Sequence, residues 1–155
     1  MKSSFTTKAI RLAIASTLAV AAGLSQAAPR DDAHSLIAAV STQVSGKGLD
    51  GAVNEINSNP ANWLRGSTYI FIADFKGNIL AHSANPKLVG KNLWEAKDAG
   101  GKLLLQEQVQ AMKSSGSATT QIRWMNPTTK RVGDAEVELK RIDGKEVFIG
   151  SPWFK

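Results

Sequence analysis

Residues Thr68 to His82 read TYIFIADFKGNILAH, and this stretch indicates the fold class. β-Branched and aromatic side chains dominate Tyr69 to Ala73, a polar segment containing Gly77 follows, and Ile79 to His82 are again mostly apolar. Two such runs joined by a short glycine-containing loop predict a β-hairpin. Because the first run is apolar on both faces, we expect the sheet to be covered on both sides.

Helical spacing precedes this hairpin. Residues 31–45 carry apolar side chains three and four positions apart, which predicts an amphipathic helix whose first turn Asp31 or Asp32 can cap. The segment Gly46 to Gly48 ends that helix. A second short helix is predicted to follow and to stop before Pro60, since proline disfavours helical geometry in the preceding residue.

The remainder of the chain predicts one more helix and three strands. Residues 83–100 lack a regular period, and Lys102 to Lys113 have helical spacing. Strands are predicted at Ala118 to Met125, Val132 to Ile142 and Val147 to Ile149. The expected fold class is therefore α+β, an antiparallel sheet of about five strands with N-terminal helices and one inserted helix.

The N-terminus has the three-part pattern of an export signal. A positively charged start is followed by an apolar run from Leu12 to Leu24, and Ser25 and Ala27 stand where a signal peptidase reads small residues. The run is shorter than the roughly 20 residues of a membrane span, which favours a cleaved signal over an anchor. We expect residues 1–27 to be a signal peptide and residues 28–155 to form a single periplasmic or secreted domain.

Composition narrows the partners of this domain. The chain has a net charge of +6, but three of its 19 basic residues lie in the predicted signal, which has no acidic residue, so the remainder carries +3. Basic and acidic residues are interspersed, so nucleic-acid binding is not expected. No later apolar run reaches the length of a membrane span. The chain has no cysteine, so the fold is expected to depend on its core rather than on disulfides.

Several short segments occur in a characteristic order. They are Tyr69 to Asp74, Gly77 to His82, Asn85 to Leu93, Lys97 to Lys102 and Arg123 to Pro127, with Lys140 and Arg141 before the last hairpin. Over roughly residues 50–150 the chain thereby resembles the single Cache family of extracytoplasmic sensor domains, which have a PAS-like fold. The resemblance implies a pocket against the sheet for a small organic ligand, often a short carboxylate. We expect a stand-alone secreted form that acts through a separate partner, such as a membrane sensor or another envelope protein.

Some positions depart from the pattern of that family. Ser83 follows the histidine where the family has proline, and Ala135 and Glu138 replace a lysine and a tyrosine on a later strand. These changes keep an alternative open, namely a protein-interaction domain of the cell envelope whose pocket has decayed. An exposed end from Pro152 to Phe154 is expected under this alternative.

Arg123 is the first candidate for ligand binding, because a guanidinium offers two parallel donors to a carboxylate. The competing interpretation is an exposed arginine on an edge strand. Trp124 should point to the opposite face, because side chains alternate along a strand. The two residues can line one pocket only if the strand is bulged, and core packing is the competing role for Trp124.

The hairpin carries the other candidates. His82 can donate to an anionic ligand or serve as a structural histidine, and Tyr69 and Phe71 share a strand face that forms a pocket wall or simply core. Lys91 is a second candidate cation, with a solvated lysine as its alternative. Asp74 is expected to cap the hairpin turn through its carboxylate.

Metal binding and catalysis are not expected. His34 and His82 lie far apart in the sequence, and no pair of residues has the spacing of a zinc site. No nucleophile, base and orienting acid stand out together. The sequence therefore predicts a binding domain without metal, cofactor or enzymatic activity.

Overall fold

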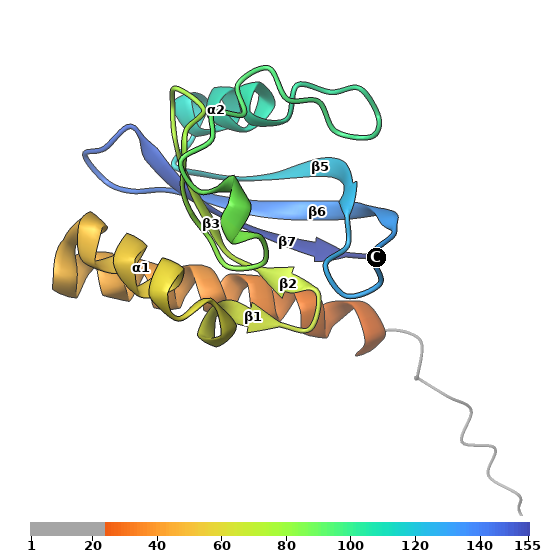
Figure 1. Ribbon diagram of the computed structural model, residues 1–155, viewed down its shortest axis with the longest axis horizontal. Helices are drawn as coiled ribbons and strands as arrows, with labels where there is room; N and C mark the ends of the chain where they lie inside the picture. Colours follow the sequence, from red (N-terminus) through yellow and green to blue (C-terminus); the bar gives the residue numbers. More distant parts are fainter. Residues whose placement is uncertain (1–23) are drawn as a thin grey trace, which may run out of the picture.

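A computed structural model describes residues 24–155, so the predicted signal peptide lies almost entirely outside the described residues. A five-stranded antiparallel sheet has α1 (Leu24–Ser58) on one face and α2 (Leu104–Ser114) on the other (Figure 1). The strand order β4-β3-β7-β6-β5 confirms the predicted α+β, PAS-like class. Within the described part of the chain, no helix combines the length and apolar character needed to cross a membrane.

The elements between and after the helices are mostly short. They are η1 (Pro60–Trp63), β1 (Leu64–Arg65), β2 (Thr68–Tyr69), β3 (Phe71–Asp74), β4 (Ile79–His82), η2 (Pro86–Leu88), β5 (Ser117–Met125), β6 (Val132–Arg141) and β7 (Val147–Phe154). The predicted strand at Tyr69 to Ala73 is divided at Ile70, because the Ile70 N–H donates to Ser83 Oγ at 3.0 Å instead of joining a ladder. The hydroxyl of Ser83 therefore ends β4 and fixes the step from β2 to β3.

The helix α1 consists of two helices, as predicted. They meet at Gly48, whose φ of 74° lies in the left-handed region that glycine adopts at little cost. The prediction that Asp31 or Asp32 caps the start is wrong, because the helix begins at Leu24. The face of α1 against the sheet buries Ala33, Leu36, Ile37, Val40 and Ile56.

The sheet separates two apolar cores. Ile72 and Ile149 face α1, whereas Phe71, Ala73 and Phe148 face α2. This alternation follows from the two-residue period of strands. It confirms the expectation that the sheet is covered on both sides.

The C-terminal end is a strand rather than an exposed tail. Antiparallel pairing with β6 places Pro152 opposite Val137 and Trp153 opposite Glu136. Trp153 is buried, with 7% of its surface exposed. The expectation of an exposed end from Pro152 to Phe154 is wrong, because this end of β7 pairs with β6, with Pro152 and Trp153 buried and Phe154 half-buried.

Asp74 caps the hairpin turn, as predicted. Its carboxylate accepts hydrogen bonds from the backbone N–H groups of Lys76 and Asn78, both at 2.9 Å, and from Asn78 Nδ2 at 2.7 Å. The next residue, Phe75, lies under the guanidinium of Arg141, whose Cζ is 5.0 Å from the ring centroid. This contact explains how β6 accommodates a charge at the end of its apolar series.

The position of Phe71 depends on a glycine in the neighbouring strand. Phe71 lies opposite Gly150 in the β3–β7 ladder. A Cβ atom at Gly150 would lie 2.1 Å from Cζ of the Phe71 ring, which is far inside van der Waals contact. The absence of a side chain at Gly150 therefore lets the ring lie flat over β7.

We predict that Gly150→Ala lowers the free energy of unfolding by about 1–3 kcal/mol, because the methyl group forces the Phe71 ring to move. Gly133→Ala is the control, since its Cβ would lie 3.6 Å from the Phe154 ring, an ordinary contact. Urea unfolding of both variants measures the difference. Equal stability of Gly150→Ala and the unsubstituted protein would show that the ring does not depend on this glycine.

Candidate ligand-binding site

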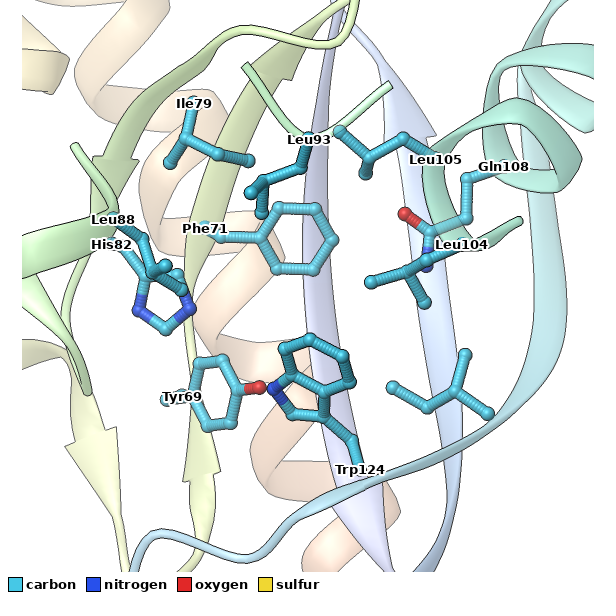
Figure 2. Close-up of a pocket in the computed structure, with 11 residues that line it drawn as sticks. Tyr69, Phe71, Ile79, His82, Leu88, Leu93, Leu104, Leu105, Gln108 and Trp124 are labelled. Carbon is cyan, nitrogen blue, oxygen red and sulfur yellow. The ribbon is translucent and has the colours of Figure 1, made fainter. Parts of the chain in front are cut away.

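A small space, here called the inner hollow, lies between the sheet and α2 (Figure 2). Its volume is about 30 Å³, which corresponds to roughly two water positions. The lining is mainly apolar, with a few polar groups among the aliphatic and aromatic side chains. The lining residues are Tyr69, Phe71, Ile79, His82, Leu88, Leu93, Leu104, Leu105, Gln108, Ile122 and Trp124.

A second space, the outer cleft, adjoins the inner hollow and has a volume of about 240 Å³. Tyr69, His82, Leu88 and Trp124 line both spaces, so these four side chains separate them. Around the outer cleft stand Ala84, Asn85, Met125, Pro127 and Lys130. The arrangement gives a mostly apolar interior behind a wider and more polar entrance.

Tyr69 and His82 form a stacked pair at this boundary. Their ring centroids are 4.9 Å apart with an interplanar angle of 25°. His82 Nδ1 accepts a hydrogen bond from the Asn85 N–H at 3.0 Å, which leaves the proton of the neutral imidazole on Nε2. Burial lowers the pKa of His82 to about 4, so the ring is neutral at pH 7. Burial also raises the pKa of Tyr69, so both groups can act as uncharged donors.

Phe71 and Trp124 occupy the middle of the site. Figure 2 shows the Phe71 ring at the centre of the group, with the Trp124 indole next to the Tyr69 ring. Trp124 is only half-buried and lines both the inner hollow and the outer cleft. The structure thus brings Tyr69, Phe71, His82 and Trp124 together, and their contact with a ligand stays a prediction.

Arg123 does not belong to this group. Its side chain is 59% exposed, and Nε lies 3.2 Å from Asp134 Oδ1 on the neighbouring strand. It lines a separate open groove at the sheet edge, with a volume of about 350 Å³. The structure places its guanidinium outside the inner hollow, in keeping with the competing interpretation of an exposed arginine on an edge strand, because β5 continues without a bulge and its alternation directs Ile122 and Trp124 inward instead. A contact of Arg123 with a ligand stays a prediction.

Lys91 is also outside the site. It is exposed and lines neither the inner hollow nor the outer cleft. Its backbone carbonyl accepts a hydrogen bond from the Ile79 N–H at 2.9 Å. The segment around Lys91 therefore extends the edge of the sheet beside β4.

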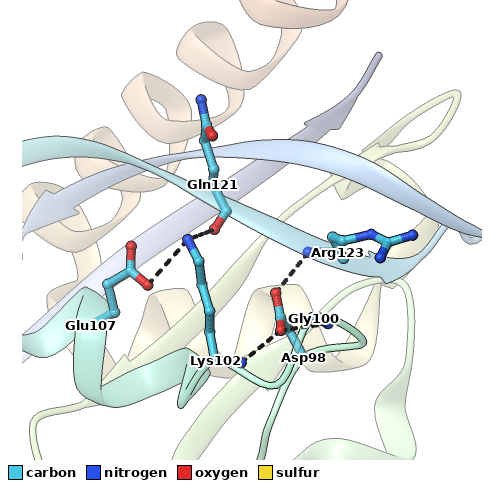
Figure 3. A network of polar contacts seen from close by, with 6 residues as sticks. All are labelled: Asp98, Gly100, Lys102, Glu107, Gln121 and Arg123. Carbon is cyan, nitrogen blue, oxygen red and sulfur yellow. Dashed lines mark hydrogen bonds and ion pairs between the residues drawn. The ribbon is translucent and has the colours of Figure 1, made fainter.

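Asp98 fixes the loop that covers the free edge of β5 (Figure 3). Its buried carboxylate accepts hydrogen bonds from the backbone N–H groups of Gly100, Lys102 and Arg123 at 2.8–2.9 Å. Burial acts to raise the pKa of Asp98, but these hydrogen bonds and the charge of Lys102 keep it below its usual value. In Figure 3 the guanidinium of Arg123 extends away from this network, so only the backbone of Arg123 contributes to it.

Two polar residues that line the site were not predicted from the sequence. Gln108 lies on the apolar face of α2, four residues after Leu104 and one before Val109. A polar residue at this position of an apolar stripe was the feature of the sequence that could have identified it. Lys130 follows the β5–β6 turn with a φ of 58°, and nothing in the sequence placed it at the entrance.

Among residues 24–155, no group of three or more histidine, aspartate or glutamate side chains is arranged to hold a metal ion. His34 lies on α1 and His82 lies on β4. His34 Nδ1 lies 2.9 Å from Glu138 Oε1 at an exposed position of α1, whereas His82 is buried beside Tyr69.

The model of the single Cache domain family, Single Cache domain 2, matches residues 10–153. The chain belongs to the single Cache family. Cache domains of this kind are extracytoplasmic sensor modules that bind small ligands, and they are a non-enzymatic domain type. A search of curated proteins finds no matching relative.

Solved structures agree with the family. A periplasmic sensor domain of a chemotaxis protein has a TM-score of 0.65 and 25% identity, with 88% of this chain and 99% of that chain covered. A methyl-accepting chemotaxis protein from Vibrio parahaemolyticus has a TM-score of 0.65 and 20% identity, with coverages of 83% and 89%. A Cache chemosensory domain described for its recognition of carboxylic acid has a TM-score of 0.64 and 22% identity, with coverages of 88% and 99%. The last two similarities, at 20% and 22% identity, are evidence for the fold alone.

We predict that His82 makes the Cache domain sensitive to mild acid. In the unfolded chain His82 takes up a proton below pH 6.5, whereas in the folded protein it stays neutral to about pH 4. The contribution of His82 to the free energy of unfolding is therefore fully present above pH 6.5 and is lost as the pH falls from 6.5 to about 4. The difference corresponds to about 3 kcal/mol. Urea unfolding of the unsubstituted protein and of His82→Asn at pH 7, 5.5 and 4.5 isolates this group, because all other titrating residues are shared. Parallel loss of stability in the two proteins would contradict the prediction.

Proposed function

We propose that this Cache domain binds a small organic molecule between the sheet and α2, outside the cytoplasm. The observation that carries the proposal is an inner hollow lined by neutral donors and apolar rings, with a wider cleft in front of it. Family membership supports the same general role. The half-buried side chains of Leu88, Leu93 and Trp124 are the walls whose movement enlarges the inner hollow for a ligand.

A short carboxylate is the proposed ligand class for the outer cleft. Lys130 supplies a cation at this entrance, and His82 Nε2 and the Tyr69 hydroxyl supply donors at the boundary. The apolar part of such a ligand then points toward Phe71 and Leu104. This arrangement replaces the guanidinium expected from the sequence by a lysine ammonium and uncharged donors.

The proposed signalling route requires a separate protein. Ligand binding changes the positions of η2 and the β5–β6 turn, because both flank the outer cleft. We propose that a membrane sensor or another envelope protein reads that surface.

A protein-interaction domain with a decayed pocket is the second candidate function. The small volume of the inner hollow, about 30 Å³, favours it. Met125 and Val132, which face each other across β5 and β6 and are 50% and 48% exposed, provide an apolar contact beside the outer cleft.

We predict that short carboxylates raise the thermal midpoint of the purified protein, with Lys130→Ala binding them several-fold more weakly because one exposed charge is lost. Arg123→Ala is the matched control, since it removes a basic side chain that faces away from the site. Thermal-shift titrations up to about 10 mM measure both effects. Loss of binding in Arg123→Ala would show that the orientation of this guanidinium differs in the bound protein. The absence of stabilisation by every acid tested would favour the second candidate.

We also propose that the exported protein begins at Ala28. The helix α1 contains Pro29, which cannot donate the backbone hydrogen bond of a helix interior. Cleavage after Ala27 places Pro29 in the first turn, where that donor is not needed. We predict that N-terminal sequencing of the protein from a periplasmic fraction starts at Ala28, and that Ala27→Gln leaves the precursor uncleaved. A start at Met1 in the exported fraction would contradict the signal peptide.

A further inference from the structure

Gln108 is a polar residue in an otherwise apolar interface. It lies on α2 among Leu104, Leu105, Val109 and Met112, and only 1% of its surface is exposed. Neither Oε1 nor Nε2 has a hydrogen-bond partner among the described residues. Figure 2 shows the amide directed from α2 toward the Phe71 ring, into the inner hollow. A buried amide without partners is unfavourable, so its presence in this place points to a group that occupies the hollow.

The inner hollow has no ionised group in its lining. Tyr69 and His82 are its titratable residues, and burial keeps both of them neutral at pH 7. The nearby cations lie elsewhere, with Lys130 in the outer cleft and Arg123 beside Asp134 at the sheet edge. An ionised carboxylate inside the hollow would be buried without an opposite charge, which is strongly unfavourable.

We infer that the inner hollow selects an uncharged group that carries both a donor and an acceptor, such as a primary carboxamide or a lactam, and that Gln108 recognises it through two hydrogen bonds. Two amides present an N–H and a C=O in one plane and can pair reciprocally. An ionised carboxylate has acceptors only and would leave Gln108 Oε1 unpaired. The inference rests on the proposed function, because it assigns the chemistry of the innermost part of the same site.

The test compares propionamide with propionate, which have the same shape but differ in charge. The proteins are the purified unsubstituted protein, Gln108→Leu, which removes both polar atoms at similar size, and Gln110→Leu as a matched control at an exposed position of the same helix. Calorimetry and thermal shift measure affinity and stability. We expect Gln108→Leu to weaken propionamide binding at least about tenfold and to change propionate binding less than about twofold. We also expect the thermal midpoint of Gln108→Leu without ligand to equal or exceed that of the unsubstituted protein. Gln110→Leu should change neither affinity.

The outcomes separate this inference from the proposed function. If propionate binds and propionamide does not, the ligand site stands and the selection of an uncharged group is wrong. Equal weakening of both probes by Gln108→Leu, or no weakening of propionamide, also overturns the inference. A lower thermal midpoint of Gln108→Leu without ligand would show that the amide has a structural role. If neither probe binds, the inference and this form of the proposed function fall together.

Discussion

The close approach of the Phe71 ring to the backbone at Gly150 determines the space available under α2. A residue with a Cβ atom at this position would push the ring toward α2, because the two would lie within 2.1 Å of each other. With glycine there, the ring lies over β7 and is nearly perpendicular to the Phe148 ring, at a centroid distance of 6.1 Å. The inner hollow is the space that remains between this ring, α2 and β5.

The charged groups near the site lie outside the inner hollow. Inside, Gln108, Tyr69 and His82 offer hydrogen bonds without an ionised group, and burial keeps Tyr69 and His82 neutral. Outside, Lys130 lines the outer cleft and the exposed Arg123 side chain lies at the sheet edge. A molecule that enters therefore keeps any charge near water, where ions are stable, and places its uncharged part inside. This separation links the proposed function to the role inferred for Gln108.

Periodicity predicted most of the fold, because strand alternation and glycine breaks are local properties. The hairpin, the cap at Asp74 and the break near Gly48 followed from residue type and spacing alone. The length of β7 did not, since Gly150 and Pro152 are poor strand formers that only pairing with β3 and β6 stabilises. The direction of Arg123 also required the structure. Alternation shows that Arg123 and Trp124 point to opposite faces, but only the position of β5 in the sheet shows which face is the pocket.

The most direct test is a high-resolution crystal structure of residues 28–155 soaked with propionamide. We predict density in the inner hollow within hydrogen-bonding distance of Gln108, with Phe71 still lying over Gly150 and with Leu88, Leu93 or Trp124 moved outward. An inner hollow filled by its own side chains, with the Gln108 amide turned to a protein partner, would contradict the account.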